Sequence, residues 1–170
     1  AHNFDIKTPF LGQMMRVRRM GCDASATQAV AMLQSWQSRC DAMGLGILRD
    51  SYKVGETRYA EQDSAKLKSI ATSIPVTTGA DLQDILQECA VRYVQAELPD
   101  FLTHAKVLFI SGKGQYRLAM ALAEHTQNLQ FADPAVHHSL PKVLHGLHEL
   151  ELYTQGAHLV SSWLPHVDVS

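Results

Sequence analysis

The side chains best suited to chemistry gather at a glycine turn in the second half of the chain. An apolar run ends at Ser111 and meets Gly112, Lys113 and Gly114, with Arg117 shortly after them. Glycines at such a turn permit positive φ angles and close approach of a ligand to the backbone. The N–H groups that open the following helix, a Lys ammonium and a bidentate guanidinium all suit a phosphate or carboxylate. We therefore expect these five residues to contact a small anionic or nucleotide-like ligand.

An acidic residue stands at the distance that a dinucleotide site would require. Asp133 lies 21 residues after Gly112 and closes a second apolar run, which is where a carboxylate meets a ribose hydroxyl pair. The third glycine of the G-x-G-x-x-G pattern is replaced by Arg117, which weakens the match to NAD or NADP binding. The cofactor is thus not identified, and NAD or NADP is one candidate. The alternative interpretation is a tight turn that binds no ligand.

Histidines follow the second apolar run and provide candidates for proton transfer. His137 and His138 come shortly after Asp133, in a segment that can face the same ligand, and imidazole titrates near neutral pH. We expect one of these two to be the acid or base if the protein is an enzyme. A separate trio, His145, His148 and Glu149, shares one helix face and could bind a metal, but a solvated face is the favoured interpretation and no metal is predicted.

The C-terminal part, residues 105–170, alternates between strand and helix patterns. The pattern predicts strands over 105–111 and 129–132, helices over 115–126 and 140–154, and a final strand within 157–164. A β-α-β-α-β order is typical of an α/β, Rossmann-like fold with parallel strands. We expect a small parallel sheet of three or four strands.

The N-terminal part, residues 1–104, is predicted to be helical. Expected helices begin at Thr8-Pro9, after Asp23, near Ser64 and near Gly79, and the last has a stripe of apolar residues, Leu82, Ile85, Leu86, Cys89, Tyr93 and Ala96. We expect these helices to pack against the sheet as ordinary core helices. Residues 1–170 then form a single domain.

The first predicted helix is also a candidate interaction surface. Met14, Met15 and Met20 would form an adaptable apolar face beside Phe10 and Leu11. Such a face could pair two copies of the chain into a homodimer or larger assembly, although methionines at helical spacing more often belong to a core.

Composition narrows the class of protein. The 170 residues are 46% hydrophobic with a net charge of −2, which excludes a typical disordered chain and argues against a general nucleic-acid binder. Three cysteines form no C-x-x-C pair and at least one is unpaired, which favours a cytoplasmic protein. No apolar run approaches the length of about 18 residues typical of a membrane span.

Two functions fit these patterns. The first is binding of a small anionic or nucleotide-like ligand at the carboxyl edge of the sheet, with or without a reaction that uses a loop histidine. The alternative is a non-catalytic interaction or regulatory domain that assembles through the methionine-rich segment.

Overall fold

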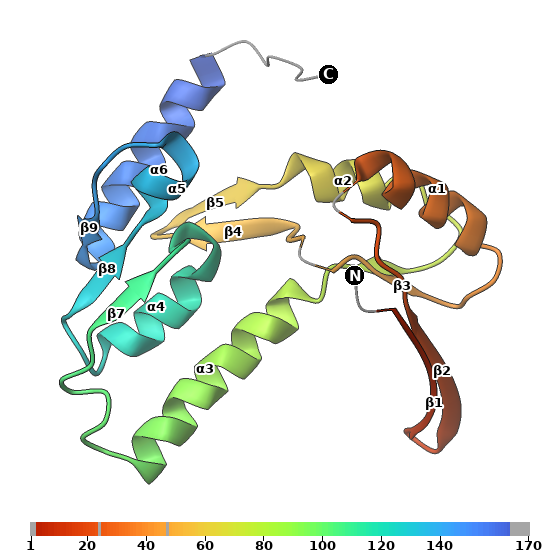
Figure 1. The fold of residues 1–170 in the computed structure, drawn as a ribbon, viewed down its shortest axis with the longest axis horizontal. Helices are drawn as coiled ribbons and strands as arrows, with labels where there is room; N and C mark the ends of the chain where they lie inside the picture. Colours follow the sequence, from red (N-terminus) through yellow and green to blue (C-terminus); the bar gives the residue numbers. More distant parts are fainter. Residues whose placement is uncertain (1–2, 24, 47, 164–170) are drawn as a thin grey trace. The chain divides into compact units, whose positions relative to one another are not determined.

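A computed structural model describes residues 3–23, 25–46 and 48–163, and the chain divides into two compact units. Unit 1 comprises residues 1–45 and 63–77, and unit 2 comprises residues 46–62 and 78–170. Figure 1 shows the order of the elements along the chain. The structure is a mixture of helices and short strands in small sheets. That the whole chain forms a single domain stays a prediction.

Unit 1 begins with an antiparallel hairpin, so the helix predicted from Thr8-Pro9 was wrong. Strand β1 (Phe4–Phe10) pairs with β2 (Gln13–Arg19), and the turn between them has positive φ angles of 48° at Leu11 and 78° at Gly12. Two such residues form the turn that best fits the twist of a two-residue hairpin. The methionine-rich segment therefore lies on a strand and its flank, and it cannot act as a helical interface.

The rest of unit 1 consists of short elements around a small core. These are α1 (Ala26–Trp36), β3 (Met43–Gly44), α2 (Gln62–Lys68), which begins at the boundary of unit 2, and β6 (Val76–Thr77), which pairs with β3 in parallel. The Ser25 side chain caps α1 by accepting a hydrogen bond from the Gln28 N–H. Leu33 and Ala71 are the buried apolar residues among the described part of this unit.

Unit 2 contains the predicted β-α-β segment. Strands β7 (Val107–Phe109) and β8 (Leu129–Phe131) are parallel and are joined through η1 (Lys113–Gln115) and α4 (Tyr116–Ala123). The third strand, β9 (Leu144–His145), pairs with β8 in the antiparallel direction, which gives the order β7-β8-β9. The sheet is therefore mixed, and the parallel part is limited to two strands.

Two further predictions in this region were wrong. The helix predicted over 140–154 begins only at Gly146, because the preceding two residues form β9 and Gly146 takes a φ of 73°. The run 157–164, predicted as a strand, continues α6 (Gly146–Trp163) as far as the described residues extend, and Leu164 lies outside them. A short helix, α5 (Asp133–His138), follows β8.

The core of unit 2 forms between the sheet, α4, α6 and a second hairpin. That hairpin consists of β4 (Ser51–Val54) and β5 (Thr57–Ala60). Phe109 and Phe131 stack with ring centroids 5.2 Å apart, and Phe131 and Leu150 are fully buried. These contacts place the carboxyl end of β7 and the start of η1 directly over the core.

Helix α3 (Ala80–Glu97) belongs to unit 2 and packs against α4 with the face that the sequence did not predict. Val91 is buried, whereas Leu82, Leu86 and Tyr93 are each more than half exposed. The predicted core stripe of this helix therefore faces solvent. Among the described residues, no helix combines the length and apolar character needed to cross a membrane.

Candidate functional site

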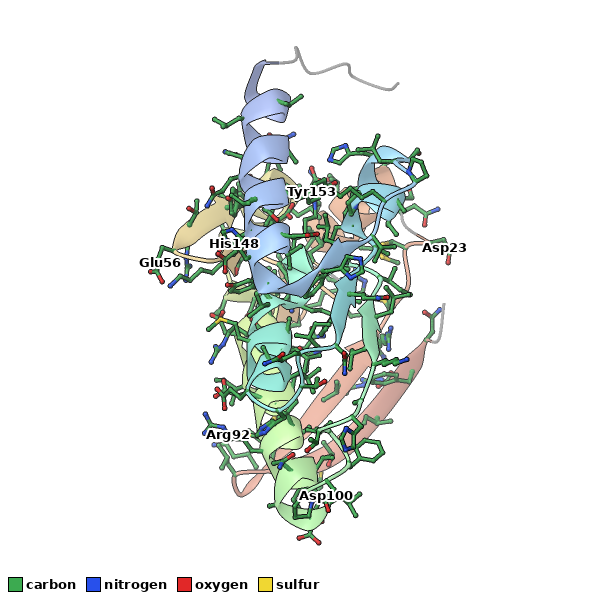
Figure 2. The ribbon with its side chains drawn as sticks, turned by 90° about the vertical axis from the view of Figure 1, so that its left-hand side faces the viewer. Asp23, Glu56, Arg92, Asp100, His148 and Tyr153 are labelled. Carbon is green, nitrogen blue, oxygen red and sulfur yellow. The ribbon has the colours of Figure 1, made fainter. Side chains whose placement is uncertain are left out.

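The β7–η1 turn is organised by the carboxylate of Asp133. The Gly112 N–H donates to Asp133 Oδ2 at 2.7 Å, and the Lys113 N–H donates to Asp133 Oδ1 at 3.0 Å. Asp133 is fully buried, and its backbone carbonyl accepts a hydrogen bond from the Tyr153 hydroxyl at 3.4 Å. Tyr153 lies on α6, where Figure 2 labels it. The backbone donors that could have faced a ligand are thus occupied by a side chain of the protein itself.

Gly112 is required for space and not for an unusual backbone angle. Its φ is −73°, and Gly114 is not among the glycines with positive φ, so neither residue uses the positive φ that glycine permits. A Cβ on Gly112 would lie 2.2 Å from Phe131 Cδ1 and 2.9 Å from Leu150 Cδ2. The close approach that the glycine permits is therefore to the core of unit 2.

Ser111 and His137 form a hydrogen-bonded pair at the same turn. Ser111 Oγ lies 3.2 Å from His137 Nε2, and the same Nε2 lies 3.9 Å from Asp133 Oδ1. In a Ser-His-Asp triad the carboxylate would contact the other ring nitrogen, so this arrangement is not a triad. It is a hydroxyl next to an imidazole, with a buried carboxylate nearby.

The surroundings of His137 favour its neutral form. Partial burial lowers the pKa of His137, and the nearby Lys113 ammonium lowers this pKa further, while Asp133 acts in the opposite direction. A neutral imidazole with its proton on Nδ1 can accept a proton at Nε2. His137 is therefore suited to act as a base near neutral pH.

The other histidines lie elsewhere. His138 packs edge-on against the Tyr153 ring, with centroids 5.8 Å apart. Glu149 accepts a hydrogen bond from the His145 N–H at 2.9 Å, which caps the start of α6. Among the described residues no group of three potential ligands is placed to hold a metal ion.

A polar cleft of about 530 Å³ lies beside the turn, within unit 2. We call it the Lys113 cleft. Its walls come from the β4–β5 hairpin, the start of α3, η1 and α4, and its charged residues are Arg49, Lys53, Arg58, Lys113 and Arg117 with Glu56, Asp81, Asp84 and Glu151. Three of the residues predicted to contact a ligand, Lys113, Gly114 and Arg117, thus line one cleft.

Lys113 has no ion-pair partner among the described residues. Its Nζ lies 5.6 Å from the centroid of the Tyr52 ring, and Tyr52 in turn stacks on Tyr59 with centroids 5.1 Å apart. Three other cations of the cleft pair with carboxylates: Arg49 binds both oxygens of Asp84, at 3.0 and 2.8 Å, Lys53 pairs with Glu56, and Arg117 pairs with Glu88. Arg58 donates to the Ser51 hydroxyl. Lys113 therefore offers the cleft an uncompensated positive charge.

Arg117 is held at the edge of the cleft by α3. Its Nη2 donates to Glu88 Oε2 at 2.9 Å, and Glu88 also pairs with Arg92, one of the residues labelled in Figure 2. Gly114 connects the cleft to the Ser111–His137 pair, because a Cβ at this position would lie 3.7 Å from Ser111 Oγ and meet no other nearby atom.

The cleft also includes residues that the sequence did not single out. Tyr52 and Arg58 come from the β4–β5 hairpin, and Tyr116 donates a hydrogen bond to Glu151. Burial and the adjacent Glu151 raise the pKa of Tyr116 to about 12. The Gly55-Glu56 turn was the available signal for a hairpin, but nothing in the sequence relates that hairpin to Lys113.

We predict that alanine destabilises the protein at Gly112 but not at Gly114. Gly112→Ala should lower the free energy of unfolding by about 1–3 kcal/mol, because the added methyl overlaps Phe131 and Leu150. Gly114→Ala is the control and should change it by less than about 0.5 kcal/mol. Urea unfolding measures both values, and equal stabilities of the two variants would contradict this account of Gly112.

The titration of His137 provides a second prediction. Its midpoint, followed by the ring proton signals in NMR spectra, should lie below 6.5, and Lys113→Met should move it upward by removing a repelling charge. Because the folded-state pKa is lowered, the favourable contribution of neutral His137 to stability is complete above pH 6.5 and is lost as the pH falls through the folded-state value. A midpoint at or above 6.5 would contradict the described surroundings of His137.

Comparisons with known proteins give two family matches. Residues 1–78 match the family described as Domain of unknown function (DUF8753), and residues 81–169 match Domain of unknown function (DUF8754). No curated protein and no solved structure matches the chain. The second match covers more than half of the 170 residues, so the chain belongs to the family Domain of unknown function (DUF8754).

Proposed function

We propose that this protein binds a small anionic or nucleotide-like ligand in the Lys113 cleft. The observation that carries the proposal is the Lys113 ammonium, which has no carboxylate partner among the described residues and lies in a cleft of about 530 Å³. The cleft contains five cationic side chains and four carboxylates. The set therefore carries one net positive charge, which a ligand with a net negative charge would compensate.

Ligand recognition would depend on side chains and not on the backbone of the turn. The Gly112 and Lys113 N–H groups already donate to Asp133, and a ligand phosphate at this position would have to displace a buried carboxylate. Lys113, Arg58 and Arg117 are instead the donors for an anion in the cleft. Asp133 is enclosed and cannot meet a ribose hydroxyl pair, so the geometry does not favour NAD or NADP here.

Tyr52 extends the proposal to nucleotide-like ligands. Aromatic rings stack on bases, but one face of Tyr52 stacks on Tyr59 and Lys113 lies over the ring. A base would therefore stack on Tyr52 in place of Lys113, once Lys113 has turned toward the phosphate. Burial and the nearby Glu61 raise the pKa of Tyr52, which keeps its hydroxyl protonated as a hydrogen-bond donor.

The Ser111–His137 pair supplies proton transfer if a reaction follows binding. The pair lies next to Gly114, which lines the cleft, and its neutral imidazole accepts a proton at Nε2. His138 is less suited to this role because its ring packs on Tyr153. The three unpaired cysteines, Cys22, Cys40 and Cys89, favour a cytoplasmic location.

A binding experiment tests the proposal. Inorganic phosphate, ADP and succinate are titrated into the protein, with heat of binding and melting temperature as readouts. We expect at least one of the three to bind, and Lys113→Met to weaken its affinity by roughly 10- to 100-fold, the loss of one charge-assisted hydrogen bond.

Lys142→Met is the matched control, because Lys142 is exposed and lies outside the cleft. This variant should bind the same ligand with unchanged affinity. The proposal fails if none of the three compounds binds, or if Lys113→Met binds as well as the unmodified protein while remaining folded.

A further inference from the structure

Helix α3 presents a regular apolar stripe to solvent. Leu82, Leu86, Cys89, Tyr93 and Ala96 are all exposed and follow one another in steps of four, three, four and three residues. The exposed fractions are 61% for Leu82, 60% for Leu86 and 67% for Tyr93, so these large side chains are not covered by the rest of unit 2. Apolar residues of this size on one continuous stripe indicate an interface.

The stripe is separate from the face with which α3 packs in its own unit. Val91 is buried, and Glu88 binds Arg117 of α4. Packing inside unit 2 therefore accounts for the inner face of α3 and leaves the outer stripe unexplained.

The spacing of the stripe matches a paired helix. Alternating steps of four and three average 3.5 residues, the repeat that keeps one seam facing a partner helix in a coiled coil. With Leu86 and Tyr93 at a positions, Leu82, Cys89 and Ala96 take the d positions. This seam is short, about two heptads, and small residues at Cys89 and Ala96 allow close approach of the helices.

Charge at the edges of the seam favours a second copy of the same helix in the parallel direction. In this numbering Arg92 is a g position and Glu97 the following e position, and side chains at these positions pair between parallel helices. Two equivalent ion pairs would form, because Arg92 of each copy would face Glu97 of the other. Arg92 is 73% exposed and pairs with Glu88 of its own helix, so it would exchange this partner for Glu97 of the second copy.

We propose that α3 pairs with α3 of a second copy of this chain, parallel and in register, through the stripe centred on Cys89. This inference goes beyond ligand binding and does not depend on it. In register, each d residue meets its own counterpart, so Cys89 lies against Cys89 of the second copy. In this dimer the Lys113 cleft of each copy is lined by residues of that copy alone.

The native mass of the full chain tests the pairing. Sedimentation over a range of protein concentrations should show a dimer, and Leu86→Glu should raise its dissociation constant at least about tenfold by placing a charge in the seam. Leu152→Glu is the matched control, since Leu152 is similarly exposed, at 55%, on α6, and it should leave the dimer unchanged. A monomer at every concentration overturns the proposal.

The β1–β2 hairpin is the rival surface, and a hairpin variant separates the two. Met15 is 42% exposed on β2, and Met15→Glu should not affect the dimer. A dimer that survives Leu86→Glu but is lost in Met15→Glu would assign the interface to the hairpin and overturn the pairing of α3.

Cysteine crosslinking tests the register. Of the three cysteines only Cys89 belongs to unit 2, so Cys22→Ser with Cys40→Ser leaves a single thiol on the stripe. Mild oxidation of this variant should give a disulfide-linked dimer, and adding Leu86→Glu should abolish it. Failure of native dimers to crosslink through Cys89 would contradict the register.

Exchanging the charges of Arg92 and Glu97 tests whether the two α3 helices run parallel. Arg92→Glu should weaken the dimer, because the introduced carboxylate would then face Glu97 of the other copy, and adding Glu97→Arg should restore it. A double variant as weak as the single one would contradict the parallel arrangement.

Discussion

The hydrogen bonds between the buried Asp133 carboxylate and the backbone of the β7–η1 turn are the constraint on which the site depends. A carboxylate removed from water is costly unless its oxygens are bonded, and each oxygen of Asp133 accepts a backbone N–H, from Gly112 and from Lys113. The same bonds join the end of β8 to the end of β7 and fix where η1 begins. They thereby determine where the Lys113 side chain leaves the backbone.

Because of this arrangement, the groups of the turn that remain available for binding are side chains and not backbone N–H groups. The two N–H groups are satisfied internally, and Gly112 lies too close to Phe131 for any side chain. The side chains that the turn presents are the Lys113 ammonium, which lines the cleft, and the Ser111–His137 pair. Gly114 also lines the cleft, and a Cβ at this position would lie 3.7 Å from Ser111 Oγ.

Part of this could be predicted from the sequence. The apolar run before Ser111, the glycines and the second run before Asp133 predicted two parallel strands joined by a helix, and β7, α4 and β8 confirm it. Asp133 was also identified as a key residue. The groups that Asp133 binds were not identified. A carboxylate 21 residues after a glycine can bind either a ribose or the backbone of the turn, and the full burial of Asp133 is what excludes the ribose.

Other features could not be predicted, for physical reasons. Phe10, Met14 and Val17 fit a helical spacing, whereas the positive φ angles at Leu11 and Gly12 that make a hairpin are not visible in residue types alone. The apolar stripe of α3 was correctly recognised as a stripe, but a sequence does not say which face of a helix its own domain buries. The Lys113 cleft depends on the β4–β5 hairpin meeting η1, a contact between distant segments.

Hydrogen exchange at the Gly112 amide tests the central role of Asp133 most directly. The amide of Ala132, which donates to the Phe109 carbonyl at 2.8 Å, is the reference for a bond at the edge of the core. We expect Gly112 to exchange as slowly as Ala132, and Asp133→Asn to accelerate exchange at Gly112 and Lys113 more than at Ala132. Rapid exchange at Gly112 in the unmodified protein would contradict the account.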